Sequence, residues 1–182
     1  LRASATAAAL LHAGASTVLV TRELEEARRA RQSHPQALLF GERGGLPPEG
    51  FDYGNSPAEA VHARGRDVIF TTTTGANRLV SSWGAHAVYM GTTVNATRVV
   101  EAAASHGRDV VLIPAGLTGH PEFDAQADRA AAVYLALKAG AEIGIGRELA
   151  DLFARRIEQE GLPALFGTAV HGKKLCALGM AS

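Results

Sequence analysis

The sequence predicts an α/β fold, with a mostly parallel sheet sandwiched between helices (α/β/α) and a helical C-terminal part. Three observations support this prediction. Short apolar, β-branched runs alternate with Ala-rich helical stretches, as in β-α-β units. The apolar runs lack polar alternation, as expected for strands covered on both faces. After Gly140 the pattern is helical only.

Five short runs are the candidate strands. In chain order they are Thr17–Thr21, Ala37–Phe40, Asp67–Thr71, Ala87–Met90 and Asp109–Ile113. The first, third and fifth are rich in Val, Ile and Thr, and the other two combine Ala and Val or Leu with an aromatic residue. β-branched and aromatic residues favour strands, which supports each assignment.

The stretches around these runs are the candidate helices. They are Ala5–Ala13, Glu23–Arg31, Pro57–Ala63, Gly75–Trp83, Asn95–Ser105, Asp124–Ala139, Arg147–Glu160 and Ala164–Leu178. Pro57 is a favourable first-turn residue, with Asn55 or Ser56 before it as a cap. Gly161 and Pro163 separate the last two helices. No linker interrupts the series, so we treat residues 1–182 as one domain.

The composition limits the classes of function. Hydrophobic residues make up 47% and the formal net charge is +0, which fits a globular chain and argues against a nucleic-acid-coating protein. Cys176 is the only cysteine, so neither an internal disulfide nor a cysteine metal cage is expected. This favours a cytoplasmic protein. No apolar run approaches the roughly 20 residues that span a bilayer, so we expect no membrane contact.

The chain opens at Leu1 inside a polar motif, LRASAT, spanning Leu1–Thr6. We expect the protein to be truncated at this end, and truncation at the other end is left open. Arg2 and Ser4 precede an Ala-rich helix, whose free N–H groups and positive dipole end would suit an anion. The alternative is an ordinary Ser cap beside a surface Arg, and the motif alone favours that alternative.

A long polar loop, GERGGLPPEGFDYGNSP, follows the strand that ends at Phe40. Connections longer than about 12–15 residues are often functional. Glu42 and Asp52 are hard oxygen ligands suited to Mg²⁺. Arg43 suits a phosphate, sulfonate or carboxylate, because its planar group donates two hydrogen bonds. The alternative is an ordered surface loop with solvated charges, and we favour function.

Two further strand-to-helix loops carry hydroxyls or acids. TTTTGAN, Thr71–Asn77, can bind oxyanions through backbone N–H and hydroxyl groups, although threonine is also common at strand ends. PAGLTGHPEFDAQAD ends in Asp124 and Asp128, one helical turn apart. This pair could hold a metal or share a proton, or it could simply favour the helix dipole. In GTTVN, Asn95 most simply caps its helix.

Together these loops resemble the 2-phosphosulfolactate phosphatase family, also called ComB-like. The matching pieces are LRASAT, GERGG followed by GFDYGNSP, TTTTGAN, GTTVN, and PAGLTG with the acid-bearing helix after it. They occur in the family's order over most of the chain. The resemblance implies a single α/β phosphatase-like domain that requires Mg²⁺. It also implies removal of phosphate from 2-phospho-3-sulfolactate, a step towards coenzyme M.

The resemblance also suggests roles for individual residues. A small phosphorylated anion would be the substrate, and its phosphoryl group would lie on the first and third loops. Its sulfonate or carboxylate end would lie on the second loop. The substrate-binding candidates are Arg2, Ser4, Arg43, Asn55, Ser56, Thr72, Thr73, Gly75 and Asn95. The catalytic candidates are Glu42, Asp52 and Asp124, and the Mg²⁺ candidates are these three and Asp128.

Departures from the family pattern motivate an alternative. Family members usually read Thr-Thr-Asn-Gly-Thr in the third loop, whereas Thr74 and Ala76 stand here. A Glu-Asp pair usually opens the following acid-bearing helix, and Gln126 and Ala127 are the nearest match. The alternative is a binding protein for a sulfonate or phosphate metabolite, without turnover or with altered specificity. The Ala-rich helices could also form a homodimer face.

Overall fold

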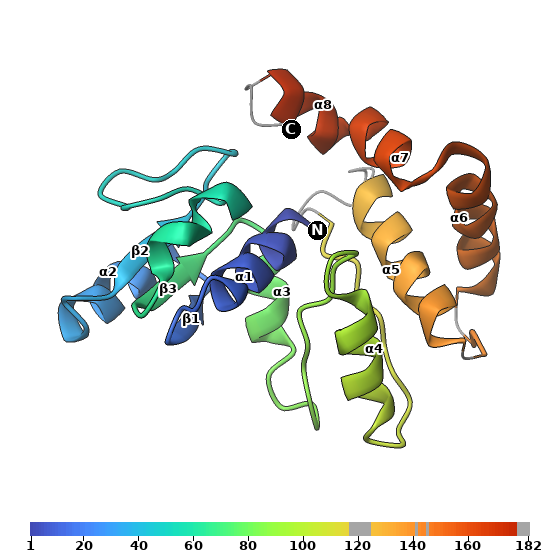
Figure 1. Ribbon diagram of the computed structural model, residues 1–182, viewed down its shortest axis with the longest axis horizontal. Helices are drawn as coiled ribbons and strands as arrows, with labels where there is room; N and C mark the ends of the chain where they lie inside the picture. The colour runs from blue at the N-terminus through green and yellow to red at the C-terminus, as the bar shows by residue number, and fades with distance from the viewer. Residues whose placement is uncertain (117–124, 141, 145, 178–182) are drawn as a thin grey trace. The chain divides into compact units, whose positions relative to one another are not determined.

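The computed structural model describes residues 1–116, 125–140, 142–144 and 146–177. It forms two compact units (Figure 1). We call residues Arg2–Met90 the sheet unit, and Leu1 with Gly91–Ser182 the helical unit. That residues 1–182 form one domain stays a prediction.

The sheet unit is an α/β structure with a three-stranded parallel sheet. Its elements are α1 (Arg2–His12), β1 (Thr17–Thr21), α2 (Leu24–Ser33), β2 (Leu38–Gly41), the 3₁₀ helix η1 (Pro57–Ala63), β3 (Asp67–Thr71) and α3 (Gly75–Ser81). The strand order is β1-β3-β2, with Leu19 and Leu39 both opposite Ile69. The first three predicted strands are therefore confirmed.

Helices cover both faces of this sheet, as the sequence predicts. Successive side chains of a strand point to opposite faces. Phe40, Val68 and Phe70 pack on one face against apolar residues of α1 and η1. Leu39 and Ile69 pack on the other face, where Ala27 of α2 covers them. The apolar strands are thus buried on two sides, which explains their lack of polar alternation.

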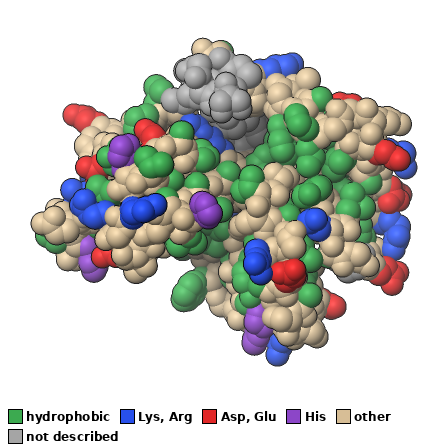
Figure 2. Space-filling model, viewed as in Figure 1, with side chains coloured by type: hydrophobic (Ala, Val, Ile, Leu, Met, Phe, Trp, Pro, Cys, Tyr) green, Lys and Arg blue, Asp and Glu red, His purple; other side chains and the backbone are tan. Residues whose placement is uncertain are grey.

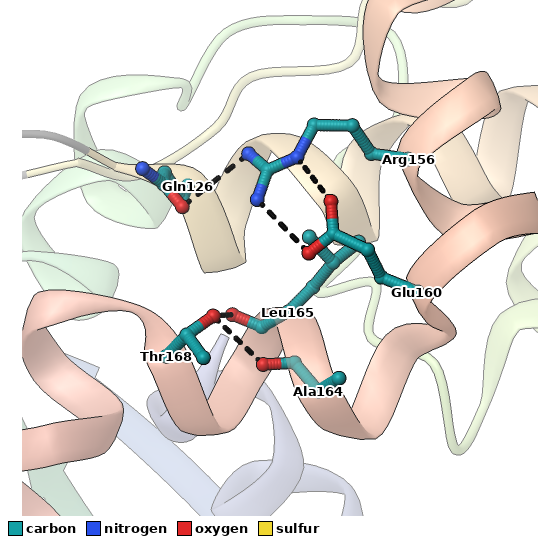
Figure 3. Close-up of polar contacts among 6 residues, drawn as sticks. All are labelled: Gln126, Arg156, Glu160, Ala164, Leu165 and Thr168. Carbon is teal, nitrogen blue, oxygen red and sulfur yellow. Dashed lines mark hydrogen bonds and ion pairs between the residues drawn. The ribbon is translucent and has the colours of Figure 1, made fainter.

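The helical unit contains α4 (Ala96–Ala104), α5 (Gln126–Ala139), α6 (Arg147–Glu160), α7 (Leu162–Thr168) and α8 (Val170–Ala177). Its core joins α5, α6 and α7 through residues such as Val133, Phe153 and Leu165. Arg156 of α6 donates to both carboxylate oxygens of Glu160, at 2.8 and 3.3 Å, and to Gln126 at 3.4 Å (Figure 3).

Two predicted strands, Ala87–Met90 and Asp109–Ile113, are wrong, because both segments are irregular. Val110 and Val111 are exposed. A strand needs ladder hydrogen bonds to a neighbour, and across the described ranges no strand pairing involves either segment. An apolar run signals a need for burial, but it does not specify the partner strand.

The predicted last helix, Ala164–Leu178, is two helices, and Leu178 lies outside the described residues. The chain is extended at Ala169, with ψ 150°. The hydroxyl of Thr168 donates to the carbonyl oxygens of Ala164 and Leu165, at 2.8 and 3.4 Å (Figure 3). Such bonding of a threonine hydroxyl to the preceding turn slightly destabilises a helix, which fits the end of α7 at this residue.

The surface fits the balanced composition. On the face shown in Figure 2, basic and acidic side chains are interspersed, with hydrophobic side chains between them. Within the described ranges, no helix combines the length and apolar character needed to cross a membrane.

Candidate active site

The carboxyl ends of the three parallel strands meet at one edge of the sheet. β1 ends at Thr21, β2 at Gly41 and β3 at Thr71. Just beyond β2, the N–H of Glu42 donates to the carbonyl of Thr71 at 3.1 Å, so the pairing continues one residue past the strand. Ligands of open α/β sheets bind at such an edge. We call this region, with the loops that leave it, the carboxyl edge.

A tight turn opens the long loop that follows β2. Arg43 and Leu46 exchange backbone hydrogen bonds of 3.0 and 3.3 Å across Gly44 and Gly45. Gly44 has φ 63° and Gly45 has φ 96°. A two-residue turn with positive φ at both central positions favours glycine. This explains the Gly-Gly sequence, and the turn brings the Gly45 N–H back towards Glu42.

Glu42 is the buried carboxylate of the carboxyl edge, with only 8% of its surface exposed. One oxygen, Oε1, accepts the backbone N–H of Thr73 at 2.8 Å, and Oε2 accepts that of Gly45 at 2.9 Å. Burial alone would raise its pKa, but these hydrogen bonds and the charge of Arg43 outweigh burial and lower it. Glu42 is therefore charged and joins the loops after β2 and β3.

Arg43 directs its terminal nitrogens at protein oxygens. Nη1 donates to the Glu42 carbonyl at 2.7 Å. Nη2 donates to the Arg22 carbonyl at 2.9 Å and to the Thr71 hydroxyl at 3.1 Å. Its three acceptors belong to, or directly follow, three different strands.

Arg2 begins α1 and lies at the same edge. Its Nη1 donates to the Gly45 carbonyl at 3.5 Å, the outer limit of a hydrogen bond. Burial lowers the pKa of Arg2, while the neighbouring charges of Glu42 and Glu59 act in the opposite direction. An Arg side chain remains charged in proteins, so Arg2 adds positive charge here.

The loop after β3 packs tightly on the start of α1. Thr72 is buried, and its hydroxyl accepts the N–H of Ala76 at 3.0 Å, which fixes the start of α3. A Cβ added at Gly75 would lie 2.6 Å from the Cβ of Ala3. Gly75 therefore permits the close approach of α3 to α1. Ser4 is half-buried in the first turn of α1.

The structure thus brings six predicted site residues to the carboxyl edge: Arg2, Glu42, Arg43, Thr72, Thr73 and Gly75. Two arginines and several backbone N–H groups surround one carboxylate. Such a donor-rich edge can bind the oxygens of a small anion.

Asp52 lies elsewhere on the sheet. Its Oδ2 accepts the N–H of Leu39 at 2.7 Å and Nη1 of Arg31 at 2.8 Å. Leu39 is the second residue of β2, three residues before Glu42. At about 3.3 Å of rise per residue, Asp52 contacts the strand about 10 Å from Glu42. Its catalytic and metal-binding roles stay predictions.

Of the other predicted residues, Asn95 and Asp128 have hydrogen-bond partners within the helical unit. Asn95 accepts the N–H of Thr92 at 2.8 Å, just before α4. Asp128, in the first turn of α5, accepts the N–H of Gly116 at 3.1 Å and the nitrogen of Leu1. Asn55 is buried and Ser56 precedes η1 as its cap residue. Asp124 lies outside the described residues, and the site roles of all five residues stay predictions.

Three buried polar atoms have no hydrogen-bond partner in the part of the chain that the structure describes. They are the hydroxyls of Thr6 and Thr21 and Oδ1 of Asn55. A buried polar group without a partner is unfavourable, so each is a place for water or a ligand group. Thr21 ends β1, and sequence reasoning missed it. Its position as the last polar residue of a predicted strand was the available signal.

The described residues do not by themselves make a metal site. Within these ranges, no three His, Cys, Asp or Glu side chains gather in a group that could hold a metal ion. Glu42 faces two N–H groups and the charges of Arg2 and Arg43, which disfavour a cation. Asp52 is paired with Arg31. The Mg²⁺ ligands therefore stay a prediction.

Known proteins resemble this chain over its whole length. A family model described as 2-phosphosulpholactate phosphatase matches residues 1–182. A "Probable 2-phosphosulfolactate phosphatase" of Deinococcus radiodurans is 37% identical, covering 100% of this chain and 77% of that protein. Proteins with the same name from Symbiobacterium thermophilum and a Synechococcus strain are 34% and 33% identical. They cover 99% and 98% of this chain, and 79% and 76% of those proteins.

Proposed function

The chain belongs to the 2-phosphosulfolactate phosphatase family, and we propose that it hydrolyses a phosphate monoester of a small anionic hydroxy acid. The substrate that its relatives' names favour is 2-phospho-3-sulfolactate, with 3-sulfolactate and inorganic phosphate as products. The place in coenzyme M synthesis that the resemblance implies is part of the same proposal.

The observation that carries this proposal is the donor-rich carboxyl edge. Arg2, the loop that begins at the buried Thr72, and the start of α1 lie together there, as the contacts of Gly45 and Gly75 indicate. A phosphoryl group carries negative charge that spreads over its oxygens during transfer. Fixed N–H groups and a guanidinium can stabilise that charge without reorganising. We assign Arg2, Ser4, Thr72, Thr73 and Gly75 to phosphoryl binding.

The reaction is a displacement at phosphorus. A water oxygen forms a bond to phosphorus as the bond to the ester oxygen on the hydroxy acid breaks. The attacking water gives up one proton, and the ester oxygen takes up one proton and leaves as the hydroxyl of 3-sulfolactate. Asn55 and Ser56 are proposed to bind the sulfonate or carboxylate end. The amide nitrogen of Asn55 can donate to an anionic oxygen, and so can the hydroxyl of Ser56.

We propose that the reaction requires Mg²⁺, and the resemblance of the loops to the family supports this. When bound, the ion would neutralise negative charge on phosphate oxygens. Dialysis against a chelator should abolish turnover, and added Mg²⁺ should restore it. Full activity in the chelated protein would contradict the requirement.

A cytoplasmic location and a homodimer are further parts of the proposal. The single cysteine supports the first, since cytoplasmic proteins seldom depend on disulfides. Fractionation of the source cells tests the location. Light scattering at micromolar concentration tests the dimer, and a strict monomer would contradict it.

The main experiment measures phosphate release by the full-length protein with Mg²⁺. We expect release from 2-phospho-3-sulfolactate and, more slowly, from phospholactate, which has no sulfonate. Arg2→Gln should reduce release strongly. No release from either ester by a folded, metal-loaded protein would contradict the proposal.

A second candidate function is binding without turnover. At the usual Glu-Asp position this chain has Gln126 and Ala127, and Gln126 accepts a hydrogen bond from Arg156 (Figure 3). Calorimetry that shows tight binding of 2-phospho-3-sulfolactate with no product would favour this function. Gln126→Glu with Ala127→Asp should then create activity. If the parent protein shows no turnover and the double variant shows none either, the altered pair does not explain the missing activity.

A further inference from the structure

The sequence favours Arg43 as a ligand for the anionic tail of the substrate, but its contacts suggest another role. We propose that Arg43 is a positioning residue, which ties the carboxyl ends of β1, β2 and β3 together. Through Glu42 it holds the loop after β3 in the shape that binds the phosphoryl group. The inference rests on the proposed function for its consequences for phosphate binding and kinetics, whereas its effect on the shape of the loop does not depend on it.

The first argument is the distribution of acceptors around the guanidinium of Arg43. Arg22 follows β1, Glu42 follows β2 and Thr71 ends β3. Arg43 donates to the carbonyls of the first two, at 2.9 and 2.7 Å, and to the hydroxyl of the third, at 3.1 Å. The same Thr71 hydroxyl donates to the Arg22 carbonyl at 3.1 Å, which closes a ring of contacts between β1 and β3.

The second argument is the geometry that these contacts require. A guanidinium holds five N–H groups in one rigid plane, so a single side chain can address several fixed acceptors at once. A lysine ammonium is a compact point charge on a flexible stem, and it does not reproduce this fork. The position therefore depends on the shape of the arginine as well as on its charge.

The third argument is the link from Arg43 to the loop after β3. Its neighbour Glu42 spans two loops, because its oxygens accept the N–H groups of Gly45 and Thr73. The glycine turn after Arg43 supplies the first of these N–H groups. Movement of Arg43 would shift the backbone of Glu42. The carboxylate oxygen of Glu42 that accepts the Thr73 N–H would then shift with it. The sequence Glu-Arg-Gly-Gly thus forms one structural unit.

This assignment makes a distinction that can be measured. If Arg43 positions the loop, its loss weakens the binding of inorganic phosphate, which has no tail. If Arg43 binds the tail, its loss weakens the binding of 3-sulfolactate and leaves phosphate binding unchanged. Arg43 contacts no reacting atom in the first case.

The test compares the wild type, Arg43→Gln, Arg43→Lys and a control, Arg66→Lys. Arg66 donates to the carbonyl of Gln36 at 2.6 Å, is exposed, and precedes β3 at the opposite end of the sheet. Thermal unfolding first establishes that each variant is folded. Calorimetry then measures the Kd of inorganic phosphate and of 3-sulfolactate, and phosphate release gives kcat and KM for 2-phospho-3-sulfolactate.

We expect Arg43→Gln to weaken phosphate binding about tenfold, the loss expected when a charge-assisted hydrogen bond no longer holds its loop. Misplacement of a positioned group by about 1 Å can reduce a rate about a hundredfold, so kcat should fall as well. Arg43→Lys should be impaired too, and Arg66→Lys should match the wild type. The proposal is overturned if phosphate binding is unchanged in Arg43→Gln, or if Arg43→Lys restores full activity.

Amide hydrogen exchange tests the positioning without reference to any reaction. The N–H groups of Gly45 and Thr73 are hydrogen-bonded to Glu42, so they should exchange slowly in the wild type and faster in Arg43→Gln. Equal exchange rates in the two proteins would overturn the proposal. If the wild type hydrolyses nothing but exchange responds as expected, the proposed function fails while the positioning role stands.

Discussion

An arginine and a glutamate meet in both compact units, but their surroundings differ. At the carboxyl edge, Glu42 is buried and its oxygens accept backbone N–H groups of two loops. In the helical unit, Glu160 accepts side-chain hydrogen bonds from Arg156 (Figure 3). Its side chain is 39% exposed. A buried carboxylate with backbone donors determines loop shape, whereas water can replace an exposed pair.

The largest effect on stability should come from Glu42→Gln. The neutral amide turns an NH₂ group towards the N–H of Gly45 or Thr73, so one buried donor loses its acceptor. Such a loss costs about 1–3 kcal/mol of unfolding free energy. Urea unfolding measures it. The matched variant Glu160→Gln should lose far less, and equal losses would show that burial does not distinguish the two networks.

Two glycines extend the comparison. Alanine at one of them should destabilise the protein, and alanine at the other should stabilise it. Gly75→Ala places a Cβ 2.6 Å from the Cβ of Ala3, and such overpacking typically costs about 1–3 kcal/mol. Gly167 lies in α7, and among the described residues an added Cβ meets no side chain and no backbone outside its own helical turn within 4 Å. Gly167→Ala should stabilise by about 0.4–1 kcal/mol, because alanine loses less entropy on folding. Thermal unfolding that shifts in the same direction for both would contradict this account.

The pH dependence of stability should report on Glu42. Hydrogen bonds outweigh burial and lower its pKa in the folded protein. Between that pKa and the unfolded value of about 4.3, the unfolded state binds more protons. The contribution of Glu42 is therefore complete above about pH 4.3 and is lost as the pH falls through the lowered pKa. The difference between the wild type and Glu42→Gln should shrink on acidification, and a constant difference would contradict the assignment.

The smallest effect should come from the Arg156–Glu160 pair. It bridges one turn of α6 near solvent, so Glu160→Gln should change the unfolding free energy far less than Glu42→Gln does. Added salt should reduce the difference from the wild type, since ions screen exposed charges. A loss as large as that of Glu42→Gln, or one independent of salt, would indicate a structural role as large as that of Glu42.

The fold was predictable where hydrophobic pattern and local pairing agree. The strands at Thr17–Thr21 and Asp67–Thr71 have the predicted bounds, and their residues pack on two faces of the sheet. The runs at 87–90 and 109–113 have the same apolar character, but strands also require partners that local sequence does not specify.

The sequence predicted where the candidate site lies better than it predicted what each residue does there. Loop composition and parallel strands placed Glu42 and Arg43 at the carboxyl edge, where the structure has them. Most of their partners are backbone atoms, such as those of Arg22, Gly45 and Thr73, and every residue type carries the same backbone atoms, so the sequence does not single them out. Asp52 illustrates the same limit, because its pairing with Arg31 depends on how the long loop folds back along β2.

The most direct test of the central claim is phosphate release from 2-phospho-3-sulfolactate by the full-length protein, measured with Mg²⁺ for the wild type and Glu42→Gln. We expect the wild type to release one phosphate for each 3-sulfolactate formed. The folded Glu42→Gln protein should be at least about tenfold slower, because the phosphoryl-binding loop loses its anchor. Equal rates in the two proteins, or no release by the wild type, would contradict the claim that this edge of the sheet is the active site.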